Sequence, residues 1–189
     1  MNFDMPHTTR VTNLPYTLRA YIVEVFIKDE PLLKKLEQKI IKNVGLNNYK
    51  TNVKGKMTSF NFFQKDPDFK KLVSKFFYEC SIDALYPGNL NPKTRMYGCN
   101  IQNSWGNILT KKDLVGRHHH LGSDWASILY FSDAVLCTEF NKFKAQRGLI
   151  ISLPSYVYHW VEPTESDKKR ISLAWNWTFE KPWGKESYK

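Results

Sequence analysis

The chain has 189 residues, 42% of them hydrophobic and 15% aromatic, and carries a net charge of +10. This composition excludes a disordered chain, the length suits one domain with a sizeable core, and no apolar run approaches the roughly 20 residues of a membrane span. The charge is compatible with an anionic partner such as nucleic acid, but the lysines are scattered, so a solvated basic surface is the simpler interpretation.

The first third of the sequence predicts a strand followed by a helix. Residues 21–27 are β-branched and aromatic, which favours a strand. Asp29 then caps a helix that has Pro31 in its first turn and ends near Gly45. The inward-facing stripe of this helix consists of Leu33, Leu36 and Ile40.

A second helix is predicted to begin after Asp66 or Asp68, either of which can cap its N-terminus. Its apolar residues recur at helical spacing: Phe69, Leu72, Val73, Phe76, Phe77 and Cys80. An aromatic stripe of this kind can line a ligand site, but packing against a sheet is far more common. We therefore expect these side chains to be buried against the outer face of the major sheet.

From about residue 95 the sequence indicates short strands separated by turns. The predicted strands span residues 96–103, 125–131, 135–140, 149–153, 156–161 and 170–179, and Gly106-Asn107 is one of the turn signals between them. This pattern predicts a mainly β protein, a jelly roll with helices against one face. The expected organisation is a single domain over residues 1–189, with helical support at about 29–90 and the jelly-roll core at about 95–180.

Three histidines stand out in the C-terminal half. Residues two apart on a strand point the same way, so His118 and His120 can reach one metal ion while His119 faces away. His159 follows at the end of the run Pro154-Ser155-Tyr156-Val157-Tyr158 and supplies a third imidazole. The alternative is that the triple histidine forms a polar turn before the strand at 125–131.

Arg170 follows His159 by eleven residues, across a polar turn. With Ser172, Ala174 and Asn176 it alternates on one face of the predicted last strand. A buried arginine on an inward face needs an anion, and its planar fork suits a carboxylate. The alternative is a salt bridge to an acidic side chain on a neighbouring strand. Together with the histidines, this arginine indicates a mononuclear iron site with a carboxylate co-substrate.

Six motifs occur in a fixed order over about 75 residues, from Trp105 to Phe179. They are Trp105-Gly106-Asn107, His118-His119-His120-Leu121-Gly122-Ser123, Ala126-Ser127-Ile128-Leu129-Tyr130-Phe131, Gly148-Leu149-Ile150, Pro154-Ser155-Tyr156-Val157-Tyr158-His159 and Arg170-Ile171-Ser172. No single motif is specific, but the ordered set resembles the 2-oxoglutarate- and Fe(II)-dependent oxygenases of the prolyl-hydroxylase-like type. More narrowly, it resembles an oxygenase family of bacteria and tailed phages.

This resemblance implies a double-stranded β-helix, the cupin-like jelly roll, with Fe(II) and 2-oxoglutarate as cofactors and O2 as co-substrate. His118 and His159 match the two histidine ligands of the superfamily. His120 stands where most members carry Asp or Glu, so the site is one negative charge short. The alternatives are that His120 only supports the ligands, or that Asp124 supplies the missing oxygen ligand.

The resemblance also assigns roles to residues around the metal. Arg170, Tyr130 and Ser172 would bind 2-oxoglutarate. Candidates for the substrate pocket are Trp105, Asn107, Trp175 and Asn176. The implied activity is a dioxygenase that couples decarboxylation of 2-oxoglutarate to oxidation of a C–H bond. The resemblance is compatible with three kinds of substrate: a protein side chain, a nucleic acid or a small metabolite.

Two other functions compete with the oxygenase. One is a cupin-like binding protein that is non-catalytic or holds a different metal, and the other is a basic phage or nucleic-acid-associated structural protein. The odd number of cysteines and the absence of a signal-peptide pattern at the N-terminus predict a cytoplasmic protein, in the host cytoplasm if the gene belongs to a phage. Oligomeric state is left open, with a homodimer as one option.

Overall fold

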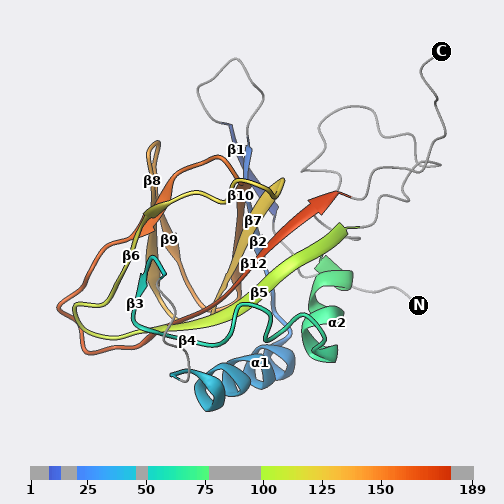
Figure 1. Ribbon diagram of the computed structural model, residues 1–189, viewed down its shortest axis with the longest axis horizontal. Coiled ribbons are helices and arrows are strands. Elements are labelled where there is room, and N and C mark those ends of the chain that lie inside the picture. Colours follow the sequence, from blue (N-terminus) through green and yellow to red (C-terminus); the bar gives the residue numbers. More distant parts are fainter. Residues whose placement is uncertain (1–8, 14–20, 46–50, 77–98, 180–189) are drawn as a thin grey trace.

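A computed structural model describes residues 9–13, 21–45, 51–76 and 99–179, which form two antiparallel sheets and two helices (Figure 1). The seven-stranded sheet contains, in spatial order, β1 (Thr9–Asn13), β2 (Tyr21–Phe26), β10 (Leu149–Pro154), β7 (Trp125–Tyr130), β12 (Arg170–Phe179), β5 (Cys99–Leu109) and β4 (Lys56–Met57). The five-stranded sheet contains β3 (Val53–Lys54), β6 (Leu114–His118), β11 (His159–Val161), β8 (Ala134–Thr138) and β9 (Lys142–Ala145). The predicted jelly roll with supporting helices is confirmed.

The two helices begin at the caps that the sequence offers. The Asp29 side chain accepts a hydrogen bond from the Leu32 N–H at the start of α1 (Glu30–Asn43). Of the two candidate caps for α2 (Pro67–Phe76), Asp66 is the one used, because its Oδ1 accepts from the Phe69 N–H. Neither helix, nor any other in the described residues, is long and apolar enough to cross a membrane.

A large apolar core lies between the helices and the seven-stranded sheet. The predicted stripe of α1 is fully buried there, as are Phe69, Leu72 and Val73 of α2. The Phe69 ring meets the Trp175 ring of β12 edge-on, with 5.6 Å between centroids. The prediction that this stripe packs on the sheet is therefore confirmed for these three residues. The side chains of Phe76, Phe77 and Cys80 lie outside the described residues.

A second apolar core lies between the two sheets. It includes Ile128 and Tyr130 from the larger sheet and Leu136 and Phe143 from the smaller one. The last strand separates the two cores, because Ile171, Leu173, Trp175 and Trp177 belong to the core under the helices, while Ala174 belongs to the core between the sheets. The alternation predicted for residues 170–179 is thus confirmed.

The predicted turn at Gly106-Asn107 is wrong, because β5 runs straight through both residues. Glycine is needed here for a close approach of backbone to side chain. A Cβ on Gly106 would lie 2.5 Å from Cγ1 of Ile40, which is fully buried on α1. The glycine therefore marks the point where the helix packs directly on the strand.

Replacing Gly106 by alanine should destabilise the fold by about 1–3 kcal/mol, because Ile40 is β-branched and enclosed and cannot move aside. Gly116→Ala is the matched control, since a Cβ there meets the Asn52 carbonyl only at 3.6 Å, an ordinary contact. Denaturant unfolding of the two variants measures the difference. Equal midpoints would show that the helix and strand can separate at this point without cost.

Candidate metal centre and adjoining pocket

The smaller sheet brings the three predicted histidines together. His118, the last residue of β6, is directly paired with His159, the first residue of β11. His120 lies just beyond the end of β6, and its N–H donates to the Ser155 carbonyl. Their ligand nitrogens all lie within 4.8 Å of one another. The predicted convergence is confirmed, and His119 turns away to contact the Tyr158 ring.

Backbone carbonyls orient two of the imidazoles. Nδ1 of His118 lies 2.8 Å from the Gly116 carbonyl, and Nδ1 of His159 lies 3.0 Å from the Val157 carbonyl. Because a carbonyl oxygen can only accept, each Nδ1 carries the ring proton. The lone pair of each ring is therefore on Nε2, as a metal ligand requires.

Burial keeps the imidazoles uncharged. It lowers the pKa of His120 to about 3 and that of His159 to about 4, and it lowers the pKa of His118 as well. The neighbouring imidazoles add a smaller effect in the same direction. All three rings are neutral at neutral pH, so this cluster of nitrogen donors fits a transition metal such as Fe(II), Ni(II) or Zn(II).

Asp124, the alternative third ligand, is not part of the cluster. Its side chain is exposed, while its backbone N–H donates to the Trp177 carbonyl and its carbonyl accepts from the Ser155 N–H. Within the described residues, histidines alone form the candidate metal site.

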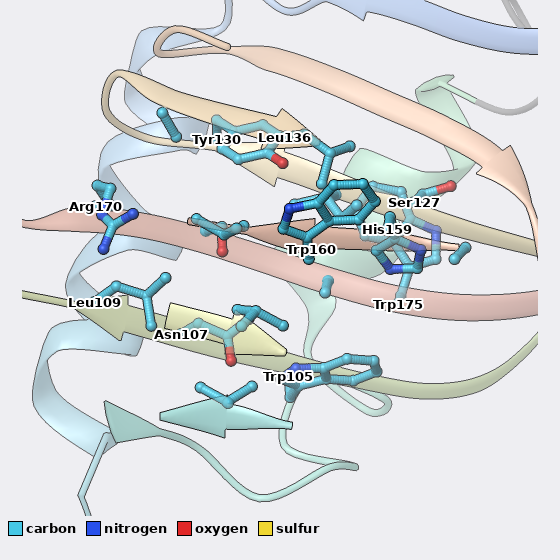
Figure 2. Close-up of a pocket in the computed structure, with 18 of the residues that line it drawn as sticks. Trp105, Asn107, Leu109, Ser127, Tyr130, Leu136, His159, Trp160, Arg170 and Trp175 are labelled. Carbon is cyan, nitrogen blue, oxygen red and sulfur yellow. The ribbon is translucent and has the colours of Figure 1, made fainter. Parts of the chain in front are cut away.

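A pocket extends from the histidines into the space between the sheets. In Figure 2, His159 and Arg170 lie toward opposite ends of this pocket, and the Tyr130 hydroxyl points into its interior. Ser172 and Asn107 also line it, from β12 and β5. The predicted co-substrate residues thus border the same space as the histidines.

Several polar atoms on the wall of this pocket lack partners. The Tyr130 hydroxyl, Oδ1 of Asn107 and Nε of Arg170 are buried without a hydrogen bond to any described residue. Such groups cost free energy unless a ligand or water satisfies them. Burial also raises the pKa of Tyr130, so its hydroxyl stays protonated and can donate. The pocket is therefore suited to a polar ligand that accepts hydrogen bonds.

The guanidinium of Arg170 is already partly engaged. Nη1 donates to the Glu162 carbonyl at 2.7 Å, and Nη2 donates to the carbonyls of Asp113 and Thr110. The alternative of a salt bridge to an acidic side chain is wrong for the described residues, since all of these acceptors are backbone carbonyls. A carboxylate in the pocket would therefore accept a hydrogen bond from Nε of Arg170, because Nη1 and Nη2 already donate to backbone carbonyls.

No protein-family model matches the sequence, and no curated protein matches it either. The fold does match solved structures. HygX from Streptomyces hygroscopicus, with nickel, 2-oxoglutarate and hygromycin B bound, superposes with a TM-score of 0.60 at 9% identity, covering 83% of this chain and 82% of HygX. The chain has the fold of the 2-oxoglutarate-dependent oxygenases. The viral collagen prolyl hydroxylase of Paramecium Bursaria Chlorella virus-1, in its 2OG complex, matches with a TM-score of 0.56 at 12% identity, covering 83% and 96%.

Within this oxygenase fold, the four predicted substrate-pocket residues divide into two groups. Trp105, Asn107 and Asn176 line the pocket, and the Trp105 ring lies 6.1 Å from the His120 ring. Trp175 borders the pocket, but its ring packs in the core under the helices. Trp160 was missed by the sequence analysis, although it directly follows His159 and also lines the pocket (Figure 2).

A second, open groove reaches the histidines from outside. It is lined by Thr51, Asn52, Val53, Phe60, Trp105, His118, His119 and His120. Phe60 stands partly exposed at this groove and contacts the Trp105 ring edge-on. His118 and His120 therefore border both the inner pocket and the outer groove, so the candidate metal position can be approached from two sides.

Proposed function

We propose that the protein is a dioxygenase dependent on Fe(II) and 2-oxoglutarate. The observation that carries this proposal is the arrangement of one pocket: three neutral imidazoles converge at one end, and unpartnered polar groups of Arg170 and Tyr130 border the rest. The likeness in fold to HygX and to the viral prolyl hydroxylase supports it. Both of those structures contain 2-oxoglutarate.

In this proposal His118, His120 and His159 hold Fe(II) through Nε2. The Tyr130 hydroxyl and Nε of Arg170 donate to the distal carboxylate of 2-oxoglutarate, and Ser172 is a third donor. Bound iron and 2-oxoglutarate would supply the oxygen-activating chemistry. The protein orients the co-substrate, and apolar side chains of the inner pocket, such as Leu136 and Val161, keep water away from it.

The substrate would approach through the outer groove. Its described lining contains aromatic, hydroxyl, amide and imidazole groups but no lysine, arginine, aspartate or glutamate. This favours an uncharged group at the reacting position, although a charge elsewhere on the substrate could still meet the basic surface. A protein side chain, a nucleic acid and a small metabolite all remain candidates. The sequence also supports a single domain and a cytoplasmic location, with a homodimer as one option for the oligomeric state.

A specific observation favours one other function. Three imidazoles without a carboxylate also suit Zn(II), so a zinc-holding protein of the same fold, without oxygenase activity, is the second candidate.

Succinate formation separates the two functions. The metal-free protein is loaded with Fe(II) or Zn(II), supplied with 2-oxoglutarate and exposed to O2. We expect slow, substrate-independent succinate release with iron, none with zinc, and inhibition by N-oxalylglycine. Iron-loaded protein that binds 2-oxoglutarate without ever releasing succinate would favour the zinc-type binding protein.

A further inference from the structure

His120 differs from His118 and His159 in the group that contacts its Nδ1. Its Nδ1 lies 3.1 Å from the side-chain amide Nδ2 of Asn176, whereas the others face carbonyls two residues earlier in the chain. Oδ1 of the same amide is buried without a hydrogen-bond partner among the described residues. The amide thus presents a donor to the ring while its own acceptor is unsatisfied.

This arrangement decides which nitrogen of His120 carries the proton. When the amide nitrogen faces the ring, Nδ1 must accept, so the proton lies on Nε2 and blocks the lone pair that a metal needs. A half-turn of the amide about its Cβ–Cγ bond brings Oδ1 to Nδ1 instead. Nδ1–H then donates, the buried oxygen gains a partner, and the Nε2 lone pair is free.

The backbone of Asn176 is held by both neighbouring strands, so the amide can change its contact with His120 by turning about its own side-chain bonds. The residue lies in β12, paired with Asn103 of β5 on one side and Ala126 of β7 on the other, and is only 6% exposed. Its backbone is therefore fixed in the middle of the larger sheet. His120, by contrast, lies beyond the end of its strand and needs a partner from elsewhere.

We propose that Asn176 is a positioning residue that selects the tautomer of His120 and so determines whether the third histidine can bind the metal. The inference rests on the proposed metal site. Metal loading favours the orientation in which the amide oxygen accepts from Nδ1, and this contact holds the ring toward the metal. Groups that orient metal-bound histidines in this way typically change metal affinity by 10–100-fold when removed.

Two substitutions at Asn176 test the proposal. Asn176→Leu removes the contact, and Asn176→Asp supplies a carboxylate that can only accept, which fixes the proton on Nδ1. Asn103→Leu is the matched control, because Asn103 is the register partner of Asn176 but lines neither the inner pocket nor the outer groove. The readouts are the Co(II) dissociation constant, the visible spectrum of bound Co(II), and ring ¹⁵N shifts of the Zn(II)-loaded protein.

We expect Asn176→Leu to bind Co(II) 10–100-fold more weakly with an altered spectrum. Asn176→Asp and Asn103→Leu should bind at least as tightly as the wild type, and His120 should carry its proton on Nδ1 in zinc-loaded wild type. Wild-type affinity and spectrum in Asn176→Leu, or weaker binding in Asn176→Asp, would overturn this inference alone. Absence of metal binding in the wild type would overturn the proposed function with it.

Discussion

Replacing His159 by alanine should abolish metal binding and, with it, all succinate formation. The side chain is 4% exposed and its ring is 4.3 Å from that of His118 and 5.1 Å from that of His120, centroid to centroid. Removing it leaves two ligands, and a two-histidine site is expected to lose at least 100-fold in affinity for Fe(II) or Co(II). Metal content after dialysis and a Co(II) titration measure the loss.

His119 provides the matched control for this experiment. It lies between His118 and His120 in the sequence, yet its ring contacts Tyr158 outside the cluster. His119→Ala should therefore keep one metal per chain at wild-type affinity. If the His119 variant lost metal while the His159 variant kept it, the assigned ligands would be wrong.

Arg170→Ala should lower turnover of 2-oxoglutarate by at least 100-fold while metal affinity stays nearly unchanged. The co-substrate loses a charge-assisted hydrogen bond in a buried pocket. The structure adds a second effect, because the carbonyls of Glu162 and Asp113 lose their donors. We expect a stability cost of about 1–3 kcal/mol from those carbonyls.

The assay must separate these two effects. Turnover is compared at temperatures where the variant is fully folded, over a range of 2-oxoglutarate concentrations. Lys168→Ala removes a nearby exposed charge without touching the inner pocket and should behave as the wild type. Normal turnover by Arg170→Ala at low 2-oxoglutarate would exclude Arg170 from co-substrate binding.

Much of the fold could be predicted because its longest elements have clear periodicity. The strand at 170–179 and the helix after Asp29 match the structure closely, since alternation and capping are strong local signals. The strands Leu114–His118 and Lys142–Ala145 were missed. The first contains Gly116, which weakens a strand signal, and the second alternates as a strand should but over only four residues, which is too short to stand out. Gly106 was misread because the sequence does not show which helix packs over it.

The candidate site was predictable as a set of residues but not as a set of contacts. The spacing of His118, His120 and His159 was sufficient to predict their convergence. Nothing local could indicate that Asn176, 56 residues after His120, meets its ring, because that contact depends on the path of the chain beyond β6. Likewise, the Arg170 guanidinium donates to the carbonyls of Glu162 and Asp113. These carbonyls lie in two loops whose conformation the sequence does not specify.

The two halves of the candidate site belong to different sheets. His118 and His159 lie on the smaller sheet, whereas Arg170, Tyr130 and Asn176 lie on the larger one. A co-substrate bound as proposed, at the histidines and at Tyr130, would therefore link the two sheets. Opening the sandwich would break both of its attachments, so ligand binding opposes that opening by mass action. If the proposed ligands bind as described, the stability of the jelly roll should therefore rise with their concentration.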